Sequence, residues 1–336
     1  VEIVADKNLI LSSSDQEIIV YNEQTKTKSN LYAATAATAA NDEISLLKHC
    51  RVAAAQRDLL FAANDKFINI YDIDYAKQLG KYKFFKDTVN CIELSSREPN
   101  VIAACDDSGD IKLIDFRLQP QQQSPALTLK RSLSRHQNIC YALKYNPANE
   151  YELFSGSFDC TVVKWDTRFI KTTGKKQQPP GFVDQIEVSG VIKQLLEKKR
   201  GKEEQAGASQ SNSDELDYLV SSMTPPFVHT LSFANLDSET TSNVLLCGIE
   251  NGLCLAFDPA SFQLCACRQL QPFNCALTQF ENIDDHHANY NNKHVVAASG
   301  NGKRIEFIYL VGAGHQKPRA DAENNHNKKS DEDTTI

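Results

Sequence analysis

Two features are missing from this sequence of 336 residues: an excess of basic side chains and a long apolar run. Lys and Arg number 36 against 43 Asp and Glu, for a net charge of -7. Neutralising nucleic-acid phosphates requires clustered basic residues, so we expect no direct nucleic-acid partner. No apolar run approaches the roughly 20 residues that cross a bilayer, so we expect a soluble protein with no membrane partner.

Paired cysteines are also missing. The chain has ten cysteines, but none form a C-x-x-C pair of the kind that holds zinc or does redox chemistry. Cys265 and Cys267 alternate along one strand candidate, so we expect both to face the packed side. Without a signal-peptide pattern, single cysteines in apolar runs indicate reduced core thiols. We therefore expect a protein of the cytoplasm, the nucleus or both, with no metal site.

Groups that could carry out catalysis are absent as well. The sequence places no nucleophile beside a base and no paired carboxylates at a suitable spacing. His286 and His287 follow two aspartates, but their Asn-rich surroundings are typical of a surface loop. Gly312 and Gly314 lack the helix start and the Lys-Ser/Thr pair that a phosphate loop requires. We therefore expect no enzymatic activity and no cofactor.

The sequence does contain a repeat. Each repeat has an apolar strand, a turn with Asp, Asn or Gly, and a second, alternating strand that often closes with an aromatic residue and Asp. The unit recurs six times, at 9–22, 59–72, 101–115, 153–166, 244–257 and 295–309. Corresponding positions of the second strands lie 50, 43, 51, 91 and 52 residues apart. Periods of about 40 to 50 residues are typical of propellers and solenoids.

Further strand candidates surround these units. We expect a leading strand at 44–47, 89–94, 139–145, 228–233 and 275–280, and a fourth strand at 127–133 and 262–270. The first unit shows no leading strand. Helix signals are nearly absent from the repeats, so the pattern predicts an all-β fold, a β-propeller, rather than a helical solenoid, a parallel α/β sheet or a β-sandwich.

The clearest unit ends in Ser-Gly-Ser-Phe-Asp-Cys-Thr-Val-Val-Lys-Trp-Asp at residues 155–166. Together with an upstream histidine, this stretch resembles the signature of the WD-repeat family, whose members are propellers that bind other proteins. The resemblance implies a hydrogen-bonded tetrad of His136, Ser155 or Ser157, Asp159 and Trp165. Buried loop ends need such side-chain partners for polar groups that no strand pairing satisfies. We therefore expect the tetrad to be structural, with His136 in that role rather than as a general base.

The other repeats depart from the signature. The residues at the tryptophan position are Tyr21, Tyr71, Ile114, Ala256 and Ile308, and no other repeat has the loop histidine. We expect those blades to depend on apolar packing. Lys164 stands where an apolar residue is usual, which leaves its orientation open.

Two neighbouring repeats carry an arginine two residues after their final aspartate, as Asp115/Arg117 and Asp166/Arg168. We interpret all four as partner-binding residues, since a planar guanidinium can bind carboxylates or carbonyls in a fixed geometry. The arrangement resembles the box by which WD-repeat substrate receptors dock onto the damaged-DNA-binding protein 1 adaptor of cullin-4 ubiquitin ligases, with Asp159, Asp166 and Arg168 at the box positions. The resemblance implies a non-enzymatic scaffold that binds this adaptor and a client protein. The alternatives are arginines that only pair with a nearby acid, and a general scaffold in an unrelated complex.

The 91-residue interval could conceal a further blade, but residues 171–213 are rich in Lys, Gln, Glu, Ser and Gly. We interpret them as an inserted loop. Residues 188–202 suggest a short amphipathic helix with a basic run at Lys198, Lys199 and Arg200; a partner-binding or nuclear-targeting segment and a solvated loop are both open. We expect one monomeric propeller domain over 1–313, with seven blades in the intact protein, and a disordered polar tail over 314–336.

Overall fold

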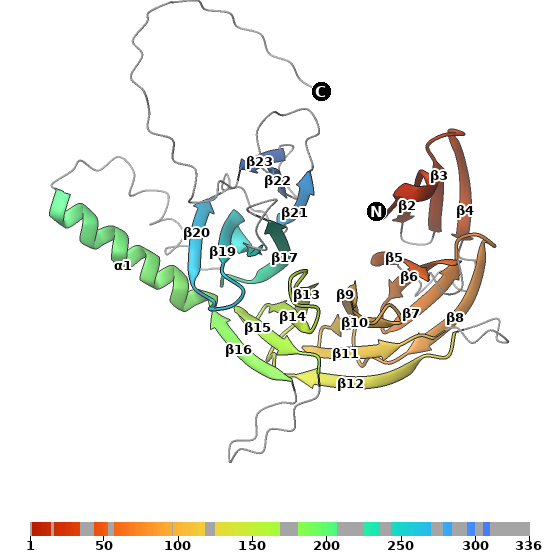
Figure 1. Ribbon diagram of the computed structural model, residues 1–336, viewed down its shortest axis with the longest axis horizontal. Helices are drawn as coiled ribbons and strands as arrows, with labels where there is room; N and C mark the ends of the chain where they lie inside the picture. The colour runs from red at the N-terminus through yellow and green to blue at the C-terminus, as the bar shows by residue number, and fades with distance from the viewer. Residues whose placement is uncertain are drawn as a thin grey trace, which may run out of the picture.

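The computed structural model describes residues 2–14, 17–33, 44–52, 57–95, 97–117, 125–168, 181–206, 225–235, 243–269, 278–283, 294–299 and 305–309. Their strands form six antiparallel sheets, five of four strands and one of three. In Figure 1 the sheets follow one another around an arc in chain order. The predicted all-β propeller architecture is confirmed.

We name the sheets blades A to F. Blade A contains β1 (Glu2–Val4), β2 (Leu9–Ser14), β3 (Glu17–Asn22) and β4 (Thr27–Ala33), and blade B contains β5 (Leu46–Val52), β6 (Arg57–Asn64), β7 (Phe67–Asp72) and β8 (Lys77–Lys83). Blade C contains β9 (Val89–Leu94), β10 (Val101–Asp106), β11 (Asp110–Asp115) and β12 (Thr128–Ser134), and blade D contains β13 (Cys140–Tyr145), β14 (Glu152–Ser157), β15 (Thr161–Asp166) and β16 (Phe182–Glu187). Blade E contains β17 (Val228–Asn235), β18 (Asn243–Ile249), β19 (Leu253–Phe257) and β20 (Leu264–Gln269), and blade F contains β21 (Thr278–Ile283), β22 (His294–Ser299) and β23 (Ile305–Tyr309).

The middle strands of blade C are buried on both faces. Every residue of β10 is buried, and so is every residue of β11 except Asp110. The outer strand β12 buries only Leu133. Because blade C packs between blades B and D, its middle strands need apolar or small side chains at nearly every position, as in other sheets covered on both sides. This explains why the second strands of the repeats are the clearest in the sequence.

Apolar contacts between neighbouring blades hold the arc together. Ile111 and Leu113 of blade C share a buried cluster with Val163 and Trp165 of blade D. On the opposite face of β15, Val162 packs into the cluster shared with blade E. Each fully buried aliphatic side chain contributes roughly 1.5–3 kcal/mol. The alternating side chains of β15 therefore connect blade D to both of its neighbours.

Two sequence assignments need correction. Blade A does have a leading strand, because β1 pairs with β2 from Glu2↔Leu11 to Val4↔Leu9; three residues are too few to show an alternation. In blade E, the tryptophan position belongs to Phe257 and not to Ala256. Phe257 is fully buried and directly precedes Asp258, as Trp165 precedes Asp166. A slip of one residue exchanges the two faces of a strand.

The expected loop at 171–213 is in its described part a strand and a helix. Residues 182–187 form β16, the outer strand of blade D. The helix α1 (Val188–Ala206) is 19 residues long, longer than the short helix suggested at 188–202. Val188 and Leu196 are buried, and Val191, Ile192 and Leu195 pack against the core between blades D and E. Residues 171–180 and 207–213 and the polar tail at 314–336 lie outside the described residues.

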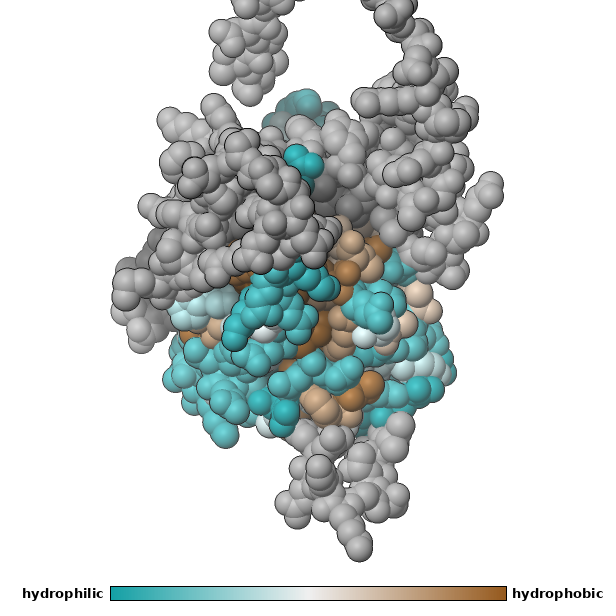
Figure 2. Space-filling model, turned by 90° about the vertical axis from the view of Figure 1, so that its left-hand side faces the viewer, coloured by the Kyte–Doolittle hydropathy of each residue, from teal (hydrophilic) through white to brown (hydrophobic). Residues whose placement is uncertain are grey.

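The helix α1 lies beside β16 and extends outward from the sheets (Figure 1). Figure 2 looks at the side of the molecule that carries it. The described residues on that side are mostly hydrophilic, with smaller hydrophobic areas between them. Contacts on this side would therefore rely largely on polar and charged groups.

Candidate protein-interaction site

The loops of the blades gather at two ends. The turns between second and third strands and the connections to the next blade lie at one end, which holds His136 and Asp159. The loops between first and second strands and between third and fourth strands lie at the other end, which holds Arg117 and Arg168. We call the first end the tetrad face and the second the arginine face.

On the tetrad face the structure brings the four tetrad residues together. The indole N–H of Trp165 donates to Ser155 Oγ at 2.7 Å, and the same Oγ lies 2.7 Å from Nε2 of His136. Nδ1 of His136 lies 3.0 Å from Asp159 Oδ2. Because an ionised carboxylate only accepts hydrogen bonds, Nδ1 carries the proton and Nε2 accepts from the serine. Both ring nitrogens are thus engaged in the tetrad.

Asp159 ties the tetrad to the surrounding backbone. It accepts hydrogen bonds from the backbone N–H of Gln137 at 2.9 Å and from the Thr161 hydroxyl at 2.6 Å. Burial alone would raise the pKa of Asp159, but the hydrogen bonds that it accepts from His136, from the Thr161 hydroxyl and from the Gln137 backbone lower it well below its usual range. The carboxylate therefore joins the turn of blade D to the loop that leads in from blade C.

Of the two candidate serines, Ser155 occupies the tetrad position. Ser157 instead donates to the carbonyl of Asn138 at 3.2 Å and accepts from the N–H of Asp159 at 3.0 Å. In blade C the corresponding strand positions hold Ala104 and Ile114, which are both fully buried. Apolar packing thus replaces the hydrogen-bonded chain there.

On the arginine face, Arg168 is held by its own aspartate and by a neighbouring ring. Its Nε and Nη2 donate to both carboxylate oxygens of Asp166 at 2.8–3.2 Å, and its guanidinium lies 4.4 Å from the centre of the Tyr151 ring. The arginine side chain is 56% exposed, whereas that of Asp166 is 13% exposed. Burial raises the pKa of Asp166, but the hydrogen bonds and charge of Arg168 lower it overall. The guanidinium is therefore fixed in position and still open to solvent.

Arg117 repeats this arrangement in blade C. Its Nε lies 3.1 Å from Asp115 Oδ2, and its side chain is 67% exposed against 11% for the aspartate. In both blades the backbone N–H of the arginine donates to the aspartate, at 3.1 Å in blade C and 2.8 Å in blade D. The same local turn thus presents an arginine from two adjacent blades, and pairing with the nearby acid leaves each one exposed.

Asp159 does not join this group. It lies on the tetrad face, at the opposite end of β15 from Asp166, and its oxygens are occupied by the tetrad. The three box positions taken from the resemblance are therefore not one contact surface. A partner on the arginine face meets Arg168 without Asp159.

Two neighbours of Arg168 have no signal in the sequence. Tyr151 comes from the loop between β13 and β14. Arg97 comes from the loop between β9 and β10 of the preceding blade, and its guanidinium lies 4.5 Å from the centre of the Tyr151 ring. Arg97 also pairs with the exposed Glu150. The ring of Tyr151 thus contacts guanidinium groups from two blades. We call Arg97, Tyr151 and Arg168 the guanidinium stack.

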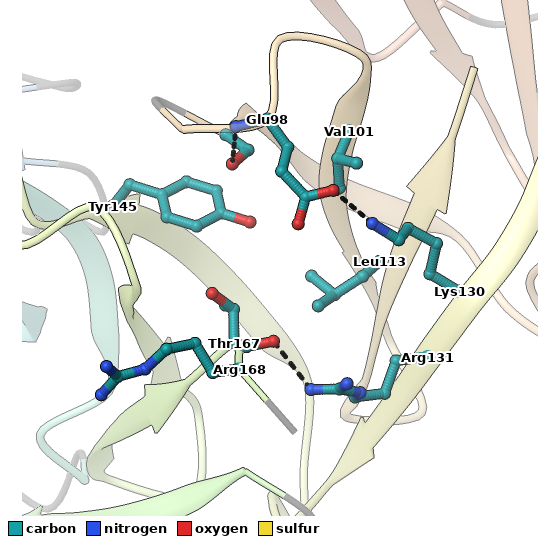
Figure 3. A pocket seen from close by; sticks show the side chains of 9 residues that line it. Glu98, Val101, Leu113, Lys130, Arg131, Tyr145, Thr167 and Arg168 are labelled. Atoms are coloured by element: carbon teal, nitrogen blue, oxygen red, sulfur yellow. Dashed lines mark hydrogen bonds and ion pairs between the residues drawn. The ribbon is translucent and has the colours of Figure 1, made fainter. Parts of the chain in front are cut away.

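A cavity of about 260 Å³ lies next to the stack, between blades C and D. The residues that line it are Ser95, Glu98, Val101, Leu113, Lys130, Arg131, Tyr145, Thr167 and Arg168. Figure 3 shows Lys130 paired with Glu98 at one side, and Arg131 donating to the carbonyl of Thr167, a bond of 2.8 Å. Apolar side chains and basic groups therefore border the same space.

Lys164, whose orientation the sequence left open, faces blade E. Its Nζ donates to the carbonyl of Pro259 at 2.9 Å and lies 3.1 Å from Glu152 Oε1. The expected packing of Cys265 and Cys267 is wrong, because both are exposed on the outer strand β20. An alternating pattern does not distinguish an outer strand from a middle one.

The described residues contain no group of three or more His, Cys, Asp or Glu placed to hold a metal ion. No helix in the described ranges is both long and apolar enough to cross a membrane. His286 and His287 lie outside the described residues.

Comparisons with known proteins agree with this fold. Residues 127–166 match the model of the family "WD domain, G-beta repeat". This range begins one residue before β12 and ends with β15. The mitotic checkpoint complex contains a chain of similar structure, with a TM-score of 0.54 and 14% identity over 92% of this chain and 76% of that one. Residues 127–166 are thus similar to a WD repeat, and the chain has the fold of a WD-repeat β-propeller.

Three relatives match parts of the sequence. Ribosome biogenesis protein YTM1 of Pyricularia oryzae is 28% identical over 35% of this chain, and the WD repeat-containing protein 53 homolog of Dictyostelium discoideum is 30% identical over 33%. The ribosome biogenesis protein WDR12 homolog of Trichoplax adhaerens is 33% identical over 34%. This chain covers 23%, 29% and 25% of these relatives, respectively. It therefore spans about a quarter of the length of the relatives it matches.

Proposed function

We propose that this protein is a non-enzymatic WD-repeat platform that docks onto a partner protein through its arginine face. The observation that carries the proposal is the repeated Asp-x-Arg turn of Arg117 and Arg168. In both blades the aspartate is nearly buried while the arginine is more than half exposed. A guanidinium already held in place loses less entropy on binding than a free one.

The partner we propose is the damaged-DNA-binding protein 1 adaptor of cullin-4 ubiquitin ligases, which leaves the tetrad face for a client protein. The support is the resemblance of the two arginine turns to the docking box of such receptors. The order and residues of 106–112 and 135–140 also resemble WD repeat-containing protein 53, and a homologue of that protein is among the relatives. A platform of this kind would act as a monomer in the cytoplasm, the nucleus or both.

Co-purification of the tagged full chain with the adaptor tests this function. The Arg117→Ala/Arg168→Ala variant should lose the adaptor, because it removes both exposed guanidinium groups. A matched control is Lys77→Ala/Lys81→Ala on the outer strand β8, which removes two exposed cations from another blade. Circular dichroism would establish that each variant is folded. Equal retention of the adaptor by the arginine variant and the unmodified chain would refute the docking.

The rival function is a scaffold in an unrelated complex. It is favoured by the names of two relatives, which are ribosome biogenesis proteins. In this case the exposed side of α1 is the expected contact. Deleting residues 171–213 would also remove β16, so charge reversal of the exposed Lys193 and Lys198 is the cleaner test. Loss of bound proteins from Lys193→Glu/Lys198→Glu, but not from the arginine variant, would favour this rival.

A further inference from the structure

Basic groups dominate the solvent side of the arginine face between blades C and D. The two aspartates that hold Arg117 and Arg168 are only 11% and 13% exposed. The exposed acids beside them are Glu98 and Glu150, and each already pairs with a basic side chain, Lys130 and Arg97 respectively. On the solvent side, the exposed bases Arg97, Arg117, Lys130 and Arg168 therefore outnumber the exposed acids.

The cavity beside the guanidinium stack is suited to one side chain of a partner. Its volume of about 260 Å³ is below the roughly 300–1,000 Å³ of small-molecule sites. Val101, Leu113 and the ring of Tyr145 supply apolar surface, and these three residues are buried. Lys130 and Arg131, from the outer strand β12, supply positive charge at its border (Figure 3).

Hydrogen-bond donors also border the cavity. Burial raises the pKa of Tyr145 far above its usual value, so its hydroxyl remains protonated and able to donate. In Figure 3 this hydroxyl lies between Glu98 and Thr167, whereas the guanidinium of Arg168 turns away from the centre of the cavity. The cavity and the guanidinium stack are thus two adjacent places for negative charge.

We propose that the arginine face binds an acidic segment of a partner protein, with one Asp or Glu side chain inserted in the cavity and a flanking carboxylate on the guanidinium stack. This inference deepens the proposed function, because it uses the same face and names the chemistry of the docking segment. The aliphatic part of the inserted side chain packs against Leu113 and Val101. Its carboxylate takes the place of Glu98 beside Lys130.

The exchange of carboxylates has a low cost. Lys130–Glu98 and Arg97–Glu150 are exposed pairs, with 35–49% of each side chain accessible. Ion pairs of this kind contribute only about 0–1 kcal/mol. Displacing Glu98 from Lys130 therefore costs little, and burial of the aliphatic part of the partner side chain against Val101 and Leu113 favours the exchange.

Binding of a fluorescein-labelled octaglutamate peptide to the full chain, followed by fluorescence anisotropy, tests the inference. The peptide should bind, more weakly at high salt because exposed charges are screened. Lys130→Glu should weaken binding about five- to tenfold, since it reverses one charge of an exposed pair. Lys83→Glu, the same charge reversal at an exposed site on the outer strand of blade B, should leave binding unchanged.

A second measurement reports on the cavity itself. Ser95 lines the cavity, so the thiol introduced by Ser95→Cys should react with iodoacetamide more slowly when octaglutamate is bound. Ser134→Cys, at an exposed position of the tetrad face, serves as the control and should react at an unchanged rate. Mass spectrometry of the labelled peptides separates these thiols from the native cysteines.

Several results would overturn the inference: equal octaglutamate binding by the unmodified chain and Lys130→Glu, tighter binding of octalysine or of an octaphosphoserine peptide, or no protection of the Ser95→Cys thiol. The adaptor co-purification is independent of these assays. If octaglutamate binds as expected while the unmodified chain fails to retain the adaptor, the proposed ligase partner is wrong and the acidic-segment inference stands. If the unmodified chain retains the adaptor but does not bind octaglutamate, the acidic-segment inference is wrong and the proposed ligase partner stands.

Discussion

Removing the hydroxyl of Ser155 is the most direct test of the tetrad. In the structure this fully buried oxygen accepts from Trp165 and donates to His136, both at 2.7 Å. Ser155→Ala leaves the indole N–H and the imidazole Nε2 buried without these partners. Each unsatisfied buried group costs about 1–3 kcal/mol, so the free energy of unfolding should fall by about 2–4 kcal/mol.

The chain supplies its own probe for this measurement. Trp165 is the single tryptophan and is fully buried, so urea unfolding can be followed by its fluorescence and compared with circular dichroism. Ser134→Ala removes a hydroxyl from an exposed position and should change stability by less than about 0.5 kcal/mol. If Ser155→Ala were no more destabilising than this control, the hydrogen-bonded chain would not stabilise blade D.

A double-mutant cycle separates the chain from its parts. His136→Ala removes the next member, so Ser155→Ala and His136→Ala should be strongly non-additive. Residues in one network typically couple by about 0.5–3 kcal/mol. Additive losses, measured by circular dichroism, would show that the two side chains act independently.

Three other predictions concern pH, a turn and a second ion pair. The pKa of Asp159 is lowered on folding. Its ionised carboxylate therefore stabilises the fold at pH values above the unfolded pKa of about 3.9, and this stabilisation is lost as the pH falls toward the folded pKa. Urea titrations in acid should show a smaller pH dependence of the unfolding free energy for Asp159→Asn than for the unmodified chain. At Gly109, φ is +80° and a Cβ would lie 2.8 Å from a carbonyl oxygen, so Gly109→Ala should lower the unfolding free energy by about 1–3 kcal/mol. The fully buried Asp58 contacts His49 at 3.0 Å and Arg51 at 2.8 Å. Asp58→Ala should lower the unfolding free energy by about 2–4 kcal/mol, and with it the melting temperature. This loss is smaller than for a wholly buried pair, because Arg51 is 45% exposed. An unchanged melting temperature would contradict the last prediction.

Local patterns were enough to predict most of the strands. The candidate at 89–94 matches β9, and the second strands of all six units correspond to strands of the structure. Alternation and turn residues are local properties of the chain, and they report directly on a strand and its ends. The resemblance of residues 155–166 and the upstream His136 to the WD-repeat signature predicted the tetrad but left Ser155 and Ser157 as alternatives.

The same patterns failed where packing decides. The strand β1 is too short to alternate, the helix α1 is stabilised by the core between blades D and E, and Phe257 rather than Ala256 faces that core. In each case the deciding contacts come from another blade. A single repeat carries no record of which neighbour covers it.

The sequence by itself determined the repeated strands and the two Asp-x-Arg turns, because each depends on residues close together in one repeat. The tetrad came from the resemblance to the WD-repeat signature. Only the tertiary structure decided that Ser155, and not Ser157, joins Trp165 to His136. It also decided that Arg97 and Tyr151 meet Arg168 beside a cavity. These residues come from loops of adjacent blades, and the distance between such loops is set by how the blades pack, which no spacing along the chain encodes.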